Sequence, residues 1–281
     1  MGQTIIEKIL SRRSGRPVRP GDIVDVAVDA RVARDFGGAN VVKNIRDHGL
    51  PVADVARTYF TFDCNPGGSD QKYAANQHAC RLFARERGVN VFDIDAGIGT
   101  HIAIEEGLVG PGGTLVSTDS HANILGAIGA FGQGMGDQDI AAAWAYGRVW
   151  FKVPESVKIV LEGKLPVGAA PKDIVLRLLR EFGAAGLLGM SAELYGEAVD
   201  GLGLAGRITV ASMATEMGAI ILLIPPNRAV LEHFDKLGRP YEAVYADADA
   251  AYVRTVEIDV SGLGPLISRP GHPEDVVEVR E

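Results

Sequence analysis

The sequence predicts an α/β protein built on largely parallel sheets. Segments with the apolar pattern of strands alternate with segments of helical periodicity along the whole chain. The 35 glycines stand in short clusters between these segments, as tight connections between strands and helices require. Hydrophobic residues make up 47% and charged residues 23% of the chain, which is typical of a globular protein. Its 281 residues are enough for two domains. We expect domains over 1–153 and 154–281, the second ending in a linker.

The first half of the chain opens with a helix over residues 4–14, because Thr4 and Glu7 have the spacing of a capping box. Strands are expected at 23–29, 59–62, 91–94 and 115–118, and helical segments at 40–48, 69–88, 119–136 and 139–151.

In the second half, strands are expected at 157–162 and 220–224, and helices at 171–182 and 191–200. Residues 201–206 match the glycine pattern of dinucleotide-binding loops, but a helical segment precedes them and 207–210 has an extended pattern. We therefore interpret 201–206 as a turn. The last residues, 253–281, hold one predicted strand and a Pro/Gly-rich run at 262–273 that is typical of a linker.

Polar residues follow three of the predicted strands directly. They are Asp63-Cys64, the segment 97–101, and Asp119-Ser120-His121. Parallel strands share one carboxyl edge, so these groups should converge there. An acid, a hydroxyl and an imidazole in succession can accept and donate protons. The alternative is a helix N-cap with a solvent-facing histidine, and the residues alone leave both interpretations open.

The net charge of −8 argues against nucleic acid or an anionic membrane as a partner. The first ten residues have no long apolar core, and no window of about 18 apolar residues occurs, so we expect no signal peptide, no membrane span and a cytoplasmic location. Cys64 and Cys80 should be free thiols. Two cysteines are too few for an iron–sulfur cluster or a structural zinc, so no metal site is expected.

A series of short motifs runs over nearly the whole chain. They lie at residues 4–10, 20–24, 62–63, 105–109, 118–121, 126–131, 134–136, 153–156, 161–165 and 213–219. In sequence and order these motifs resemble the aconitase superfamily, and within it the large-subunit family of the 3-isopropylmalate dehydratases. The resemblance implies three-layer α/β/α aconitase-like domains with mostly parallel sheets. It also implies a hydro-lyase or isomerase that acts on a small hydroxy-di- or tricarboxylate.

Residue by residue, the resemblance implies two sets of site residues. The catalytic set is Asp63, Cys64, His101, Asp119, Ser120 and His121, and the substrate-binding set is Thr100, Asn123, Ser212 and Glu216. Three positions depart from the family pattern. Cys64 and Thr100 stand where the family has histidines, and Ser212 stands where it has an asparagine. His101, one place after Thr100, is a candidate to replace the second lost imidazole.

The family's hydro-lyases use a [4Fe–4S] cluster as Lewis acid. The cysteine motifs that bind it would fall beyond Glu281, so the expected cofactor is none within this chain, and [4Fe–4S] only if a partner chain supplies it. The resemblance implies as partners a small carboxylate substrate, a C-terminal-half large subunit and a small swivelling subunit. An oligomer is expected, because a chain without the family's third domain would expose apolar surface.

Three functions remain open. The chain is half of a split hydro-lyase, or a cluster-independent enzyme with Cys64, His101 and His121 as a rebuilt acid–base set, or a non-catalytic carboxylate-binding or partner-binding scaffold. The intact polar group at 119–121 favours the two enzymatic hypotheses.

Overall fold

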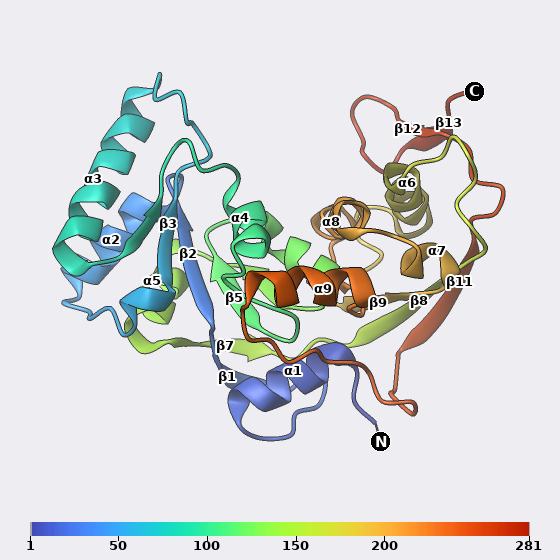
Figure 1. Ribbon diagram of the computed structural model, residues 1–281, viewed down its shortest axis with the longest axis horizontal. Coiled ribbons are helices and arrows are strands. Elements are labelled where there is room, and N and C mark those ends of the chain that lie inside the picture. Colours follow the sequence, from blue (N-terminus) through green and yellow to red (C-terminus); the bar gives the residue numbers. More distant parts are fainter. Residues whose placement is uncertain (1, 281) are drawn as a thin grey trace.

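Parallel sheets organise both halves of the computed structural model, which describes residues 2–280 (Figure 1). The first sheet contains β2 (Ala30–Arg34), β3 (Thr58–Thr61), β4 (Asn90–Phe92), β5 (Thr114–Ser117) and β6 (Phe131–Gly134) in the order β4-β3-β2-β5-β6. The second contains β8 (Ser156–Glu162), β9 (Ser191–Tyr195), β10 (Ile221–Leu223) and β11 (Arg254–Asp259) in the order β10-β9-β8-β11. All neighbouring strands in both sheets are parallel, which confirms the predicted fold class.

Helices cover the sheets in two lobes (Figure 1). The first lobe has α2 (Gly38–Asp47), α3 (Gln71–Arg87), α4 (Gly99–Glu105), α5 (Asp137–Tyr146) and the 3-10 helices η1 (Val55–Arg57) and η2 (Ser120–Ile128). The second has α6 (Pro171–Phe182), α7 (Glu197–Asp200), α8 (Leu204–Ala211), α9 (Arg228–Leu237) and the 3-10 helix η3 (Thr215–Met217). In Figure 1, α2, α3 and α5 lie on the outer side of the first sheet, and α4 lies on the side that faces the second lobe.

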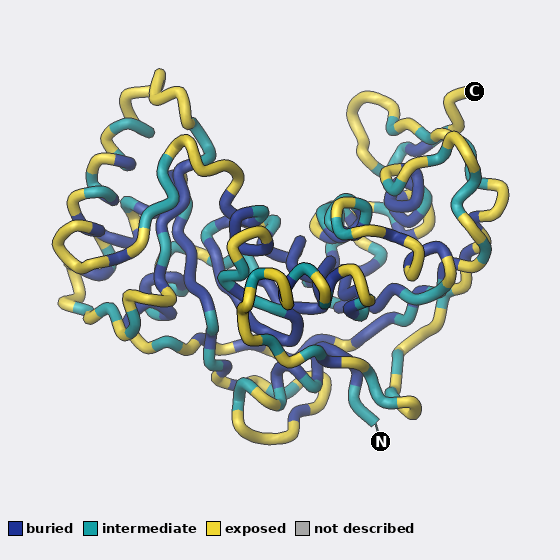
Figure 2. Tube along the Cα trace, viewed as in Figure 1, coloured by how far each residue is buried: buried dark blue, intermediate teal, exposed yellow. Residues whose placement is uncertain are grey.

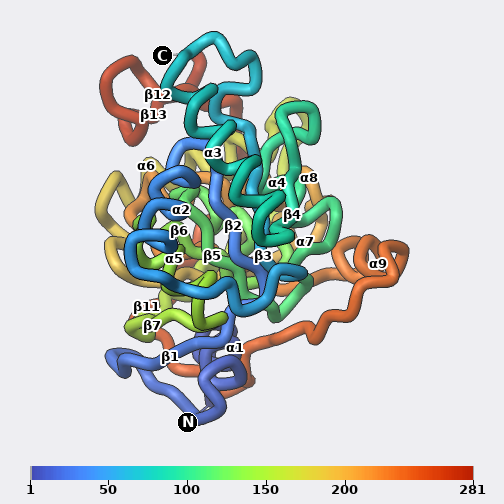
Figure 3. The backbone as a smooth tube through the Cα atoms, turned by 90° about the vertical axis from the view of Figure 1, so that its left-hand side faces the viewer, coloured from blue at the N-terminus to red at the C-terminus, as the bar shows by residue number. Residues whose placement is uncertain are grey.

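The N-terminal helix α1 (Ile5–Ser14) connects the lobes from below, beside the antiparallel pair β1 (Ile23–Ala27) and β7 (Arg148–Lys152) (Figures 1 and 3). Its predicted capping box between Thr4 and Glu7 is confirmed. Its apolar face is fully buried, and the backbone amide of Ile5 donates to the buried carboxylate of Glu193 in β9 over 2.5 Å. The start of the chain is therefore fixed to the second lobe.

Several predicted elements of the first half have other bounds in the structure. The strand predicted at 23–29 is β1, and a separate parallel strand, β2, begins at Ala30. The helical segment predicted to residue 136 ends at Ile128, because the chain turns at Gly129 (φ 68°) into β6. The helix predicted over 139–151 ends at Tyr146, where Gly147 (φ 69°) leads into β7.

Three predictions for the second half were wrong. The helix predicted over 191–200 begins as the buried strand β9 and becomes helical only in α7. Residues 207–210, predicted to be extended, lie in α8, which begins at Leu204, inside the run 201–206 predicted as a turn. The run predicted as a linker contains β12 (Leu266–Ser268), which pairs with β13 (Val276–Glu278) in an antiparallel hairpin. In each case packing against the second sheet or α6 overrides a weak local pattern.

The two lobes interlock between η2 and the pair α8–β10. Gly126 in η2 lies so close to β10 that an added Cβ would come within 2.1 Å of the Leu222 carbonyl oxygen. The fully buried Arg207 of α8 donates to the carbonyl oxygens of Ala127 (2.8 Å) and Ile224 (2.9 Å). Figure 2 shows buried backbone continuing from the first sheet into the second through this region.

The division at residues 153 and 154 stays a prediction. The second sheet begins at Ser156, but α1 and η2 each contact both halves of the chain. Among residues 2–280, no helix is long and apolar enough to span a lipid bilayer.

Candidate active site

The site lies where the strand order of the first sheet changes direction. From β2 the chain proceeds to β3 and β4 on one side and then returns to β5 and β6 on the other. Arg34 ends β2, Asp63 follows β3, and Asp119 follows β5. Ligands of open α/β sheets bind at the carboxyl edge beside such a switch point, so these three side chains lie where a site is expected.

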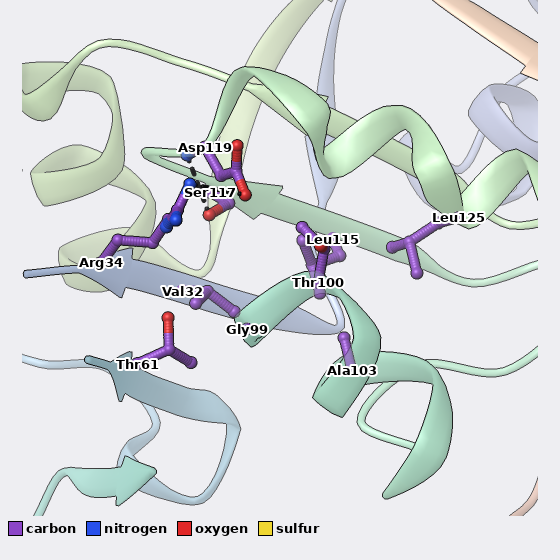
Figure 4. Close-up of a pocket in the computed structure, with 10 residues that line it drawn as sticks. All are labelled: Val32, Arg34, Thr61, Gly99, Thr100, Ala103, Leu115, Ser117, Asp119 and Leu125. Carbon is purple, nitrogen blue, oxygen red and sulfur yellow. Dashed lines mark hydrogen bonds and ion pairs between the residues drawn. The ribbon is translucent and has the colours of Figure 1, made fainter. Parts of the chain in front are cut away.

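Arg34 joins the carboxylates of Asp63 and Asp119, and Figure 4 shows its side chain beside Asp119. Its Nε lies 2.6 Å from Asp63 Oδ1, and its Nη1 lies 3.0 Å from Asp119 Oδ2. The side chains of Asp63 and Asp119 are only 3% and 6% exposed. Burial alone would lower the pKa of Arg34, but Asp119 and the hydrogen bond to Asp63 raise it, so the guanidinium stays charged. The sequence analysis did not identify Arg34.

Asp63 is also held by the start of α4. Its Oδ2 accepts a hydrogen bond of 2.6 Å from the Gly99 backbone amide. Gly99 is required there, because an added Cβ would come within 2.4 Å of Thr61 Oγ1. The next residue, Thr100, is buried and lines the same pocket, and its role in substrate binding stays a prediction. His101 lies further along α4, and no described residue bonds to its buried Nδ1.

His121 connects the lobes at this edge. Its backbone amide donates to Asp119 Oδ1 (3.0 Å), its Nδ1 lies 3.2 Å from Ser120 Oγ, and its Nε2 lies 3.3 Å from Glu216 Oε1. Glu216 belongs to η3 of the second lobe, and the neighbouring Thr215 accepts a hydrogen bond of 2.9 Å from Asn123 Nδ2. The side chain of His121 is 45% exposed, so its ring is accessible while both nitrogens have a partner.

Ser212 does not join this cluster among the described residues. Its hydroxyl donates to the Thr209 carbonyl oxygen of its own helix over 2.8 Å. Of the two site residues predicted in this segment, Ser212 and Glu216, it is Glu216 whose side chain reaches His121.

Cys64 sits beside the cluster as a neutral thiol. Its Sγ lies 3.8 Å from Asp63 Oδ1, and its backbone amide donates to the buried Asp35 over 3.1 Å. Burial and the neighbouring Asp35 carboxylate raise the pKa of the Cys64 thiol to about 12. The thiolate that a nucleophile or base requires is therefore disfavoured.

Asp35 organises this loop and was missed by the sequence analysis. Its carboxylate accepts hydrogen bonds from the amides of Cys64 and Asn65 and from the side chain of Gln77 (2.9 Å). Burial opposes its charge, but the hydrogen bonds from Gln77 and Cys64 outweigh it and lower the pKa of Asp35.

A narrow pocket continues below the cluster (Figure 4). Its polar rim includes Arg34, Thr100 and Asp119, and apolar side chains such as Leu115 and Leu125 form its floor. The side chains leave no volume that a water molecule can enter. The interior of this pocket is therefore closed, and the accessible polar groups of the cluster lie at the Arg34–His121 edge.

The family model of the aconitase family (aconitate hydratase) matches residues 7–281. The chain belongs to the aconitase family. It is 36% identical to 3-isopropylmalate dehydratase large subunit 1 of Thermotoga maritima, and the alignment covers all of this chain and 68% of that protein. It is 37% identical to the corresponding large subunit 1 of Methanopyrus kandleri, again over all of this chain and 68% of the relative.

The homoaconitase large subunit of Thermus thermophilus is 38% identical over all of this chain and 66% of its own length. The chain thus spans about two thirds of the length of these relatives, in a family whose named members are hydro-lyases. The resemblance seen in the motifs is confirmed.

The described thiols do not fit the [4Fe–4S] cluster of the aconitase family. Cys80 is fully buried in the core beside Phe60 and Phe83, and only Cys64 reaches the strand edge. A cluster needs several thiolates at one point, and Cys64 is neutral.

One group of potential metal ligands occurs among the described residues. Asp35, Asp63 and Cys64 place ligand atoms within 4.8 Å of one another. Their oxygens, however, already accept hydrogen bonds from Gln77, Gly99 and Arg34. These hydrogen-bond donors would compete with a cation for the same oxygens.

Proposed function

We propose that this aconitase-family chain takes part in adding and removing water on a small hydroxy-di- or tricarboxylate. The observation that carries the proposal is the contact between His121 of the first lobe and Glu216 of the second, at the carboxyl edge beside Arg34. His121 can transfer a proton, and the Arg34 guanidinium can bind a substrate carboxylate. Elimination of water from a carbon beside a carboxylate requires both groups.

The geometry supports a proton relay. When Glu216 holds the proton on His121 Nε2, Nδ1 can accept the hydroxyl proton of Ser120, 3.2 Å away. The Ser120 oxygen then acts as the base that removes a proton from the substrate carbon. The leaving hydroxide takes up the proton that His121 Nδ1 accepted from Ser120, so the substrate loses one water, and His121 and Ser120 return to their first protonation states.

Arg34 offers a place for one substrate carboxylate. Its Nε and Nη1 are engaged by Asp63 and Asp119, while its Nη2 has no partner among residues 2–280. The remaining N–H groups on this edge can bind a carboxylate oxygen.

Charge balance argues for a contribution from a second polypeptide. Asp63, Asp119 and Glu216 already place three carboxylates around Arg34 and His121. A hydroxy-dicarboxylate adds two more negative charges, so stable binding needs further cationic groups. We propose that a partner chain supplies them, together with the [4Fe–4S] cluster. This chain covers about two thirds of large-subunit relatives, so we propose that polypeptide related to their remaining third and a small subunit supply these groups.

The cluster-independent alternative has less support, because the raised pKa of Cys64 removes one member of its acid–base set. A specific observation favours the non-catalytic scaffold: Cys64 and Thr100 stand where the family has histidines, so this edge lacks two imidazoles. A split hydro-lyase should turn over substrate only with its partners, whereas a scaffold should bind carboxylates without turnover in either case.

The test follows the ultraviolet absorbance of the conjugated alkene with a panel of hydroxy-dicarboxylates and their enoates. The chelator-treated chain is assayed alone and after co-expression with a Cys-x-x-Cys-bearing chain and a small subunit. We expect turnover only with the partners, and a loss of at least about a hundredfold in His121→Ala. His78→Ala, an exposed histidine on α3, is the control.

Each outcome separates the functions. Turnover by the chelated chain alone would replace the split-subunit proposal with the cluster-independent one. If no mixture turns over and calorimetry still detects carboxylate binding, the chain is a scaffold. Equal activity of His121→Ala and wild type would refute the proton relay.

A further inference from the structure

A second cavity lies at the opposite end of the first sheet, about 490 Å³ in volume. It sits beside Asp29, which precedes β2, Tyr59 near the start of β3, and Gly113, which precedes β5. The carboxyl ends of the same strands carry Arg34, Asp63 and Asp119. The cavity is therefore separate from the candidate active site, and the proposed function does not use it.

Arginines from three distant parts of the chain line this cavity. Arg13 comes from α1, Arg57 from η1, and Arg239 from the segment that follows α9. In Figure 1 this segment leaves α9 and runs past α1 before it enters β11. We call the cavity lined by Arg13, Arg57, Arg239, Tyr59 and Tyr241 the arginine pocket.

The arginine pocket is positively charged on an acidic protein. Its lining holds three arginines against two carboxylates, Asp29 and Glu242, while the whole chain has a net charge of −8. Arg239 has no ion pair or hydrogen bond among residues 2–280. An unpaired guanidinium in a concave, net-positive pocket favours a bound carboxylate or phosphate.

Asp29 holds two of the arginines in place. Its carboxylate lies 2.7 Å from Arg13 Nη2 and 3.6 Å from Arg57 Nη1. The same carboxylate accepts a hydrogen bond of 3.0 Å from the Thr114 backbone amide, so its own position is fixed by β5. The guanidinium groups are thus positioned before any ligand arrives, which lowers the entropic cost of binding.

The wall opposite is a glycine-rich loop, residues 107–113, packed on the segment 239–242. An added Cβ on Gly112 would come within 2.0 Å of the Glu242 carbonyl oxygen, and one on Gly110 within 2.7 Å of Tyr241 Cβ. The Glu242 amide also donates to the Pro111 carbonyl oxygen over 3.3 Å. These close contacts make the pocket a built cavity rather than a space between separate loops.

The same loop has free backbone donors. Among the described residues, the amides of Val109 and Gly110 have no hydrogen-bond acceptor. Both residues line the cavity. Unpaired amides beside a guanidinium are typical partners of anionic oxygens.

We propose that the arginine pocket binds a small organic anion that carries a phosphate or a pair of carboxylates. The rings of Tyr59 and Tyr241 are held by Phe92 (6.0 Å) and Phe234 (6.0 Å), so they form fixed side walls for the organic part of the ligand. Arg239 and the free amides bind the anionic oxygens, and Arg57 binds from the other side.

Isothermal titration of the purified chain with inorganic phosphate, succinate and adenosine monophosphate tests the proposal and distinguishes the sources of the anion. We expect saturable binding of at least one probe, weakened at least about tenfold in Arg239→Glu, as loss of a charge-assisted hydrogen bond implies. Arg57→Gln should weaken the same probe. Circular dichroism and thermal melting confirm that each variant is folded.

Arg228→Glu is the matched control. Arg228 lies at the other end of α9, its side chain is 91% exposed, and the substitution changes the net charge by the same amount. If the affinity for the probe falls equally in Arg239→Glu and Arg228→Glu, the anion is attracted only by the overall charge of the protein, and the proposal is overturned. Absence of saturable binding by all three probes, or binding unchanged in Arg239→Glu, would also overturn it.

Discussion

Replacing Arg34 with glutamine should lower the free energy of unfolding by about 3–5 kcal/mol, the cost of leaving a buried charge without its partner. Arg34 lies 2.6 Å from Asp63 and 3.0 Å from Asp119, whose side chains are 3% and 6% exposed. Glutamine removes the charge and leaves two nearly buried carboxylates facing each other across the switch point.

Urea denaturation of the wild type and of Arg34→Gln at pH 7 measures this difference in the free energy of unfolding. Arg81→Gln is the control, since Arg81 makes a similar bidentate pair with Asp93 on side chains that are 30% and 41% exposed. The control should lose about 1 kcal/mol or less. An Arg34→Gln variant no less stable than Arg81→Gln would refute the reasoning.

Three further predictions concern single residues. Cys64 should react slowly with iodoacetamide at pH 8 and faster as the pH approaches its raised pKa of about 12, measured by mass spectrometry; rapid labelling at pH 8 would contradict this. Gly126→Ala should cost about 1–3 kcal/mol in urea denaturation, because its Cβ would meet the Leu222 carbonyl oxygen at 2.1 Å, whereas Gly264→Ala, with nothing within 4 Å, should change little. Burial raises the pKa of Glu193 despite the hydrogen bonds from Tyr195 and Tyr252, so the folded state holds its proton more tightly than the unfolded state. Stability should therefore fall as the pH rises from the usual glutamate range through that raised pKa, and Glu193→Gln should flatten this part of the profile; an unchanged slope would show that Glu193 does not contribute.

The sequence was sufficient to bring Asp63, Asp119 and Glu216 to one site, because position after a strand and motif resemblance both depend on order along the chain. Arg34 was missed for a definable reason. One strand was predicted over 23–29, so the second strand at Ala30–Arg34 and the polar pair at its carboxyl end were not recognised. An end of the first strand at Val28-Asp29 would have indicated that a second strand begins at Ala30.

Other features depend on tertiary contacts that no local pattern contains. Ser212 bonds to its own helix, and His101 projects from α4, a helix that the sequence analysis did not predict. The neutral state of Cys64 results from burial and from Asp35, which lies 29 positions earlier in the chain. The arginine pocket likewise combines α1, η1 and the segment after α9, and only the folded chain brings them together.

The interlocked contact between η2 and the α8–β10 pair has a consequence for how the reaction groups are aligned. Arg207 binds carbonyl oxygens on both sides of this contact, and Gly126 allows no added atom between them. The lobes are therefore not free to hinge about it, and His121 meets Glu216 as soon as the chain has folded. Folding of the chain therefore already includes the entropic cost of aligning His121 with Glu216. A substrate that binds at this edge meets the two side chains in their aligned positions.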